Sequence, residues 1–328
     1  MNKILKNIFS SREFLLLLVI MILLITIGSN TKYFFTLSNF SGLLADISIN
    51  SIIICGMTVL LISGTFDMSI GTLLPTISVL FGLLVEHKVP IIGAILISIL
   101  AGSAIGFIIG IIITKLNINA FITTLAFLFI FEAASWLIGL TSKIAMTEFS
   151  PTFKDFPEYF TRIAGGKLFG IEYINFYALA IIIIFYFLLR KNVFFRQNFF
   201  IGGNENAAKL AGIKVNIVRI FNHMIMSGLV AVAALLKVSR IGTASAQSGG
   251  KQLTLMVIAA AFVGGAVLKG GKGSIIGSFF GIIIIAILQN AMAILNMNPV
   301  YTQMILGFLL LLAIIIDETI NMYRTKKR

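Results

Sequence analysis

The sequence predicts an all-α polytopic membrane protein, on the evidence of its composition and of the way its apolar residues are grouped. Of its 328 residues, 59% are hydrophobic and 11% are charged, whereas soluble domains have about 45–50% apolar and about 25% charged residues. A soluble globule of this length cannot hide that apolar excess in one core. The apolar residues also form long runs, such as 174–189, 275–288 and 304–316. A soluble, secreted or disordered protein is therefore excluded.

About ten segments are apolar enough to be transmembrane helices, since a span needs about 20 such residues, or fewer inside a bundle. The basic stretch 1–12 precedes the first segment, but no small-residue cleavage site follows that segment. We therefore expect an uncleaved first helix rather than a signal peptide. The predicted segments are 13–29, 41–62, 69–85, 90–113, 121–140, 173–190, 217–236, 253–268, 274–295 and 301–317.

The distribution of basic residues predicts the topology. With the N-terminus inside, the tails and the loops on the cytosolic side hold 16 of the 25 Lys and Arg residues. This bias follows the positive-inside rule, so both termini are predicted to be cytosolic. The net charge of +13 is then a consequence of topology rather than a sign of nucleic-acid binding.

Two connections in this single transmembrane domain, 1–328, are long. The stretch 141–172 is predicted to be an external loop, because Pro151, Pro157 and the pair Gly165-Gly166 favour turns over a spanning helix. The stretch 191–216 is predicted to be the main cytosolic loop.

The cytosolic loop specifies one short helix of about two turns. Asn204 is a good N-cap, Glu205 suits the positive first turn, and Ala-rich residues 207–211 favour helix. Gly212 fits the left-handed position that follows a helix. Glu205 and Lys209 are spaced to pair with each other or with a partner. The residues alone leave two roles open: a connector lying on the membrane surface, or a docking element.

A predicted helix break lies at 63–71, which reads SGTFDMSIG. Gly64 and Gly71 interrupt the helix, and Asp67 is an acid among apolar neighbours. Ser69 and Asp67 can cap a helix that begins near residue 70. Because an acid at membrane depth is expensive, Asp67 is either such a cap or a direct gating or permeation residue.

The stretch 264–277, GGAVLKGGKGSIIG, superficially suggests a phosphate loop. The Walker pattern fails because Ala266 stands where it needs Gly and Gly273 where it needs Ser or Thr. We expect a tight cytosolic turn, in which Gly271 and Gly273 allow close helix packing. Neither a nucleotide nor any other cofactor is expected on this chain. One cysteine and two distant histidines also predict no metal site.

Polar residues at membrane depth are candidates for a path along which a polar molecule could pass, because such a molecule needs amide, hydroxyl and aromatic partners. Each of them can equally serve helix–helix hydrogen bonding. Glu132 and Trp136 of the fifth segment lie on one helical face and form the most suggestive pair. The candidates are Asn50, Glu132, Trp136, Asn222, Gln289 and Asn290. The titratable residues at this depth, Asp46, Glu132 and His223, lie on different segments without evident pairing.

The run GGNENAAKLAGI at 202–213 resembles the cytosolic signature of binding-protein-dependent ABC-importer permeases of the ribose type, within the branched-chain amino acid/ribose permease superfamily. The stretches 63–71 and 264–277 resemble two further segments of that family, in the family's order. The resemblance covers about 14–317. Small departures occur at Ser63, Thr65 and Phe262.

This resemblance implies a type II ABC-importer-like fold in which the short cytosolic helix docks in a cleft of a partner ATPase. Its alanines are expected to enter that cleft. The coupling residues carried over are Gly203, Asn204, Glu205, Ala207, Ala208, Lys209 and Gly212. The residues assigned to helix breaks or gating are Gly64, Asp67, Ser69, Gly71, Gly271 and Gly273.

The implied function is the transmembrane subunit of an ATP-driven importer in the bacterial inner membrane. It would move a small polar solute, a monosaccharide first, by alternating access. Implied partners are a cytosolic ABC ATPase that uses the ATP, a second permease copy and an extracytoplasmic solute-binding protein. Alternatives are a permease for nucleosides or branched-chain amino acids and an ion-coupled secondary transporter. A membrane-embedded enzyme is disfavoured because no activated nucleophile or carboxylate pair is evident.

Overall fold

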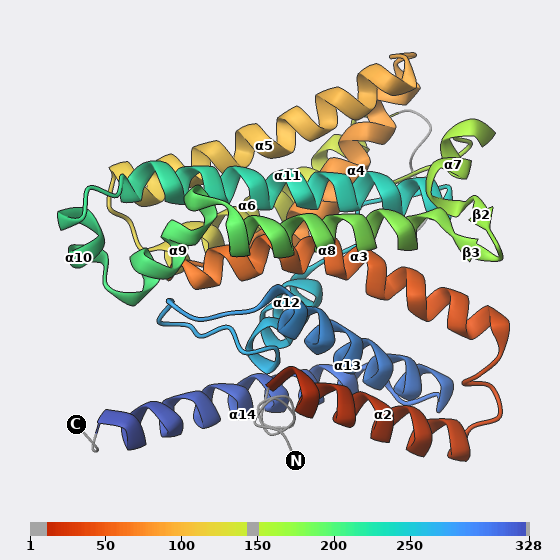
Figure 1. The fold of residues 1–328 in the computed structure, drawn as a ribbon. Helices are drawn as coiled ribbons and strands as arrows, with labels where there is room; N and C mark the ends of the chain where they lie inside the picture. Colours follow the sequence, from red (N-terminus) through yellow and green to blue (C-terminus); the bar gives the residue numbers. More distant parts are fainter. Residues whose placement is uncertain (1–11, 143–150, 326–328) are drawn as a thin grey trace.

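The computed structural model describes residues 12–142 and 151–325, which form thirteen helices and two short strand pairs (Figure 1). Each of the ten predicted apolar segments coincides with one of these helices. Seven helices, α2, α3, α5, α6, α8, α11 and α13, are long and apolar enough to cross a membrane. The helices are α2 (Arg12–Asn30), α3 (Leu37–Ile62), α4 (Ile70–Glu86), α5 (Ile91–Lys115), α6 (Ala120–Leu140), α7 (Glu158–Gly165), α8 (Tyr173–Lys191), α9 (Val193–Gly203), α10 (Glu205–Leu210), α11 (Val215–Ile241), α12 (Lys251–Val263), α13 (Ile275–Ile294) and α14 (Pro299–Thr325).

The long helices run side by side along one axis of the molecule, with α10 at one end and α7 at the other (Figure 1). Helix α3 is the centre of the bundle and packs against α8, α11, α12 and α13. Its most apolar window is 89% buried, whereas the corresponding window of α2 is 6% buried. Helix α2 packs one side, with Ile20, Leu23 and Ile27, against the core and exposes Leu18, Ile22 and Ile25 on the other, so its outer surface suits lipid.

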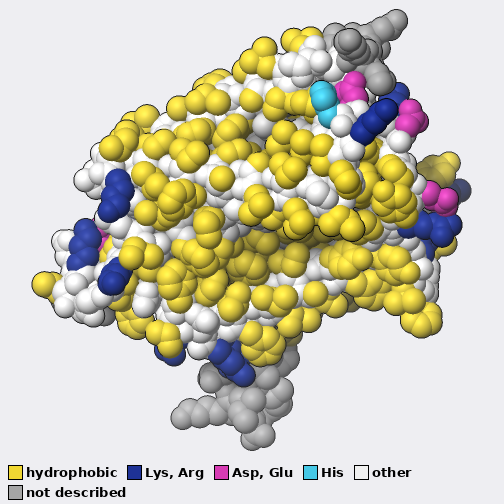
Figure 2. Space-filling model, turned by 90° about the horizontal axis from the view of Figure 1, so that it is seen from above, with side chains coloured by type: hydrophobic (Ala, Val, Ile, Leu, Met, Phe, Trp, Pro, Cys, Tyr) yellow, Lys and Arg dark blue, Asp and Glu magenta, His cyan; other side chains and the backbone are white. Residues whose placement is uncertain are grey.

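The outer surface of the molecule is divided by polarity. Figure 2 shows hydrophobic side chains over the broad middle of one face, with Lys and Arg gathered at the two ends. Exposed apolar residues of α5, including Ile92, Leu96 and Leu100, contribute to this band. An apolar band between two charged ends is the pattern of a membrane-spanning bundle.

Close packing of α5 on α11 depends on glycines spaced four residues apart. A Cβ at Gly106 would lie 2.2 Å from the carbonyl oxygen of His223, and one at Gly110 would lie 2.7 Å from Cα of Ile220. Neighbouring Gly102 faces Ser227 in the same way. Small residues let the two backbones approach, as in other membrane helix pairs.

The stretch 191–216 differs from the single predicted helix, because it contains two helices, α9 and α10. Helix α9 is capped by Asn192, whose side chain accepts a hydrogen bond from the Phe194 amide at 2.9 Å. Its apolar residues Phe195 and Ile201 are buried against neighbouring helices. The aromatic run of α9 has no clear helical pattern, so tertiary burial rather than local propensity explains this helix.

The stretch 141–172 contains no spanning helix in its described part. It holds the short helix α7, which begins after Pro157, and the hairpin of β2 (Lys167–Leu168) and β3 (Ile171–Glu172). Strand β1 (Thr152–Phe153) pairs antiparallel with β4 (Ala244–Ser245), which follows α11. This connection therefore touches the helix bundle directly; residues 143–150 lie outside the described part.

Candidate functional site

The short helix α10 has the predicted capping geometry. The Asn204 side chain accepts a hydrogen bond from the Ala207 amide at 3.0 Å. Gly212 has φ +82°, and its amide donates to the Lys209 carbonyl at 3.0 Å. The next amide, of Ile213, donates to Ala208. A left-handed glycine closed by two such bonds ends the helix sharply, so the predicted N-cap and C-terminal glycine are confirmed.

Two ion pairs fasten α10. Glu205 binds Lys209 of its own helix at 2.6 Å and Arg219 of α11 at 2.8 Å. The hydrogen bond from Lys209, reinforced by Arg219, lowers the pKa of Glu205. The predicted pair of Glu205 and Lys209 is present, and Arg219 adds a link to α11 that the sequence did not indicate.

The predicted orientation of α10 is wrong in one respect. Ala208 is 3% exposed and packs against Ile201, Val215 and Val218, so it cannot enter a partner's groove. The opposite face is open: Ala207 is exposed and Leu210 is 90% exposed. Leu210 is the one large apolar side chain of α10, and this composition was the signal that sequence reasoning missed.

Three glycine-containing motifs, far apart in the sequence, meet in a glycine junction formed by Gly64, Gly202, Gly270 and Gly271. A Cβ at Gly202 would lie 2.0 Å from the Ile62 carbonyl oxygen and 2.3 Å from the Gly271 nitrogen. The Gly271 amide donates to the Ile62 carbonyl at 2.8 Å. The junction therefore joins the end of α3, the end of α9 and the turn before α13.

Two other glycines assigned from the sequence, Gly203 and Gly273, differ in the space around them. A Cβ at Gly203 would meet no atom within 4 Å, so space does not require glycine there. A Cβ at Gly273 would lie 2.6 Å from Cγ1 of Ile62, which supports the predicted close packing.

At the break between α3 and α4, Asp67 is fully buried and acts as a local cap. Its Oδ1 accepts hydrogen bonds from the amide and hydroxyl of Ser69, at 2.8 and 2.6 Å. Helix α4 begins at Ile70, as predicted, but the Ser69 side chain makes no capping bond of its own. The other carboxylate oxygen lies 3.8 Å from Nδ1 of buried His223, a neighbour that sequence spacing did not reveal.

Gly71, one residue into α4, lies against the start of α12. Its carbonyl accepts a hydrogen bond from the Gly250 amide at 2.7 Å, and its amide donates to Oγ1 of Thr254 at 3.0 Å. A Cβ on Gly71 would lie 2.1 Å from the Gly250 carbonyl oxygen. Gly71 thus allows α4 and the start of α12 to approach closely.

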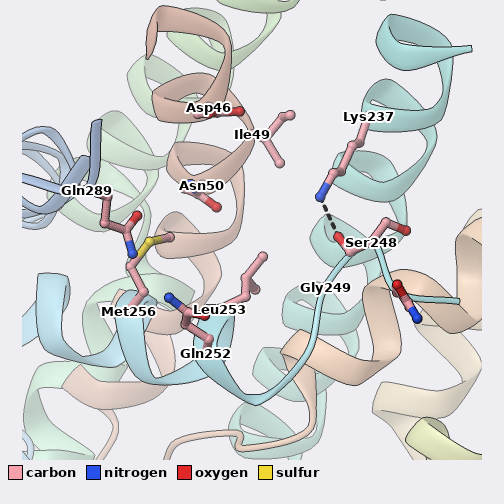
Figure 3. Close-up of a pocket in the computed structure, with 11 residues that line it drawn as sticks. Asp46, Ile49, Asn50, Lys237, Ser248, Gly249, Gln252, Leu253, Met256 and Gln289 are labelled. Atoms are coloured by element: carbon pink, nitrogen blue, oxygen red, sulfur yellow. Dashed lines mark hydrogen bonds between the residues drawn. The ribbon is translucent and has the colours of Figure 1, made fainter. Parts of the chain in front are cut away.

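A polar pocket of about 320 Å³ opens between α3, α11, α12, α13 and the connection 242–250 (Figure 3). Its volume lies at the lower end of the range of about 300–1,000 Å³ that is typical of small-molecule sites. Carboxamides dominate its polar lining, with one acid and one amine. The lining residues are Asp46, Ile49, Asn50, Lys237, Gln247, Ser248, Gly249, Gln252, Leu253, Met256 and Gln289.

The structure separates the six predicted solute-path residues. Asn50 and Gln289 line the polar pocket. Asn222 instead donates to Asn198 of α9 at 2.7 Å, and Asn290 exchanges hydrogen bonds with Asn39 of α3. These two asparagines serve helix–helix contacts, the role that was left open for each candidate.

The suggestive pair on α6 does not line the polar pocket. Glu132 forms an ion pair with Lys251 of α12 at 3.1 Å, a pairing that was not evident from the sequence. Trp136 is 38% exposed, on the outside of the described chain. The pocket gains instead Lys237, whose amine donates to the Ser248 carbonyl (Figure 3). Sequence reasoning missed Lys237 because the predicted segment 217–236 ends one residue before it, whereas α11 continues to Ile241.

Comparison with known proteins agrees with this architecture. The family model described as "Branched-chain amino acid transport system / permease component" matches residues 39–314. The ribose import permease protein RbsC of Haemophilus influenzae is 30% identical over 319 residues, covering 96% of this chain and 94% of that protein. The Bacillus subtilis RbsC is 32% identical and covers 90% of both chains.

The L-arabinose transport system permease protein AraH of Escherichia coli is 32% identical, covering 92% of this chain and 89% of that protein. No solved structure matches the chain. The family model spans most of the helix bundle, including the short helix α10, the glycine junction and the polar pocket. The chain therefore belongs to the family of branched-chain amino acid transport system permease components.

Proposed function

We propose that this chain is the membrane-spanning subunit of an ATP-driven, binding-protein-dependent importer of a monosaccharide. The observation that carries this proposal is the end-to-end similarity to permeases named for ribose and L-arabinose. The polar pocket supports it, because carboxamides beside one acid and one amine can bind the hydroxyls of a sugar. The permease is expected to lie in the bacterial inner membrane with both termini cytosolic and about ten spans.

The partner ATPase is proposed to dock on the exposed face of α10. Leu210 is 90% exposed in the described chain, and burial of a leucine side chain in a partner's cleft contributes about 1.5–3 kcal/mol. The stretch 264–277 lacks the Walker pattern, so ATP is expected to be bound and used by the partner alone. A second permease copy and a solute-binding protein at the opposite end complete the proposed assembly.

The fold offers a direct mechanical route from α10 to the polar pocket. Glu205 ties α10 to Arg219 near the start of α11, while Lys237 near the end of α11 lines the pocket. Helix α11 has 27 residues, or a length of about 40 Å. A push on α10 is thus passed along one continuous helix, which is the basis for the proposed alternating access.

Energy-source and solute tests separate this proposal from its alternatives. The permease, its ATPase and its binding protein are reconstituted in proteoliposomes, and uptake of labelled D-ribose and L-arabinose is measured. Uptake is expected to require ATP and to persist when the proton and sodium gradients are collapsed. Uptake driven by a gradient without ATP would establish the ion-coupled transporter instead. Preferred transport of isoleucine or adenosine over both sugars would assign the solute to the amino acid or nucleoside class.

A further inference from the structure

The polar pocket holds two opposite charges on different helices. Asp46 projects from α3 and Lys237 from α11 (Figure 3). Both line the same cavity, yet no N···O contact within 4.0 Å joins them. Lys237 donates one hydrogen bond, to the Ser248 carbonyl. The Asp46 carboxylate forms no hydrogen bond with any described residue, so both groups keep free capacity inside the pocket.

A neighbouring pair shows what direct pairing looks like in this protein. Glu172 and Arg240, from β3 and α11, form an ion pair at 2.5 Å, and Ser41 adds a hydrogen bond to the same carboxylate at 3.0 Å. Buried charges are costly and are usually paired. Asp46 and Lys237 remain apart with a cavity of about 320 Å³ beside them, so their separation leaves room for a ligand.

We propose that Asp46 and Lys237 form a charge-balanced selectivity filter, through which the permease itself favours uncharged, hydroxyl-rich solutes. This inference rests on the proposed function, which places the polar pocket on the solute path. A carboxylate accepts hydrogen bonds from solute hydroxyls, and the two unused N–H groups of an ammonium donate to solute oxygens. Asn50 and Gln289 add amide donors and acceptors to the same cavity.

The filter works against solutes with a net charge. A cation is attracted to Asp46 but repelled by Lys237, and an anion meets the reverse. Neither ion recovers in the pocket the hydration energy that it loses on entry. An uncharged polyol loses less hydration energy and satisfies both charged walls. The permease, as well as the binding protein, would therefore discriminate between uncharged and charged solutes.

Cysteine reactivity measures the balance of charge directly. The reporter is Asn50→Cys in a Cys55→Ala background, in the reconstituted complex with its ATPase and binding protein. The probes are the anionic sulfonatoethyl and the cationic trimethylammonioethyl methanethiosulfonates, and the readout is the ratio of their reaction rates. Asp46→Asn should shift this ratio about tenfold toward the anionic reagent. Lys237→Met should shift it about tenfold toward the cationic reagent.

Internal controls keep this result interpretable. The double variant Asp46→Asn with Lys237→Met should return the ratio to that of the unsubstituted reporter protein. Glu158→Gln removes a carboxylate from an exposed ion pair on α7 and should leave the ratio unchanged. Shifts in one common direction, or no shift in either single variant, would overturn the proposal. So would failure of both reagents to modify the reporter in a complex that imports sugar.

Uptake then tests the filter itself, measured without the reporter. Each single variant should import D-ribose at least severalfold more slowly than the unsubstituted complex at equal membrane abundance. Unchanged D-ribose uptake in both variants would overturn the filter even if the reagent ratios shift. Failure of the unsubstituted complex to import sugar would instead count against the proposed function, while the reagent ratios would still report the charge balance.

Discussion

At the scale of single residues, Gly202 and Gly203 offer the sharpest comparison in the chain. They are neighbours at the end of α9, but a Cβ on Gly202 would overlap two backbone atoms and one on Gly203 would meet nothing within 4 Å. Because the glycine junction is made of backbone, it cannot move aside for a methyl group. Gly202→Ala is expected to destabilise the junction by roughly 1–3 kcal/mol or more, whereas Gly203→Ala should be tolerated.

Thermal unfolding in detergent, together with membrane abundance and sugar uptake, checks this difference. Gly202→Ala should lower the unfolding temperature and reduce uptake per molecule, and Gly203→Ala should match the unsubstituted protein in both. Equal behaviour of the two variants would mean that the close approach at Gly202 has no energetic importance.

Local rules predicted some residues of the site and failed for others. Asn204 and Gly212 were assigned correctly because capping depends on backbone conformation over a few residues. Ala208 was assigned to the wrong face, because the side of α10 that is buried depends on its packing against α9 and α11. No spacing rule brings Asp67 beside His223, which are 156 positions apart in the chain. Such contacts come from the fold as a whole.

At the scale of elements, the attachment of α10 to α11 depends on the charge of Glu205. The bonds from Lys209 and Arg219 lower its pKa below the ordinary value of 4.5. A group with a depressed pKa stabilises the folded arrangement above its unfolded pKa and loses this effect as pH falls through the folded pKa. The attachment should therefore be constant around neutral pH and weaken only in acid, as the pH falls below the ordinary pKa of 4.5.

Hydrogen exchange of the α10 amides, read by mass spectrometry between pH 3 and pH 7 and corrected for intrinsic exchange rates, measures this attachment. Glu205→Gln should expose these amides at every pH and remove the acid-dependent step. The exposed ion pair of Glu158 and Arg162 on α7 supplies the control, since Glu158→Gln should leave α10 unchanged. An acid step that survives in Glu205→Gln would assign the effect to another group.

Elements were predicted better than their contacts. The apolar segments were found because a span requires a long run of apolar residues, whatever its neighbours are. Helix α9 was missed because its aromatic run Phe194-Phe195 and Phe199-Phe200 shows no simple helical period. The convergence of α3, α9 and the turn before α13 at the glycine junction was equally invisible, because it requires the folded positions of all three.

At the scale of the whole molecule, helix α11 joins an end that can receive a partner to a pocket that can receive a solute. Asn50 and Gln289 of that pocket were among the predicted residues, because amides at membrane depth are conspicuous. Lys237 and the connection 242–250 were not, since only the packing of α11 against α3 brings them to the cavity. Sequence thus indicated the kind of protein, while structure was needed to assemble the pocket.

Pocket accessibility in the assembled transporter tests whether α10 controls the polar pocket through α11. The measurement is the rate at which an external methanethiosulfonate modifies Asn50→Cys, in the Cys55→Ala background, with and without a non-hydrolysable ATP analogue. The analogue should change this rate severalfold, and Leu210→Asp, which places a charge on the docking face of α10, should abolish the change. Asn206→Asp, which adds a charge to the same short helix at another exposed position, should preserve most of it. If the modification rate does not change with nucleotide, or changes equally in Leu210→Asp, then α10 does not control the polar pocket.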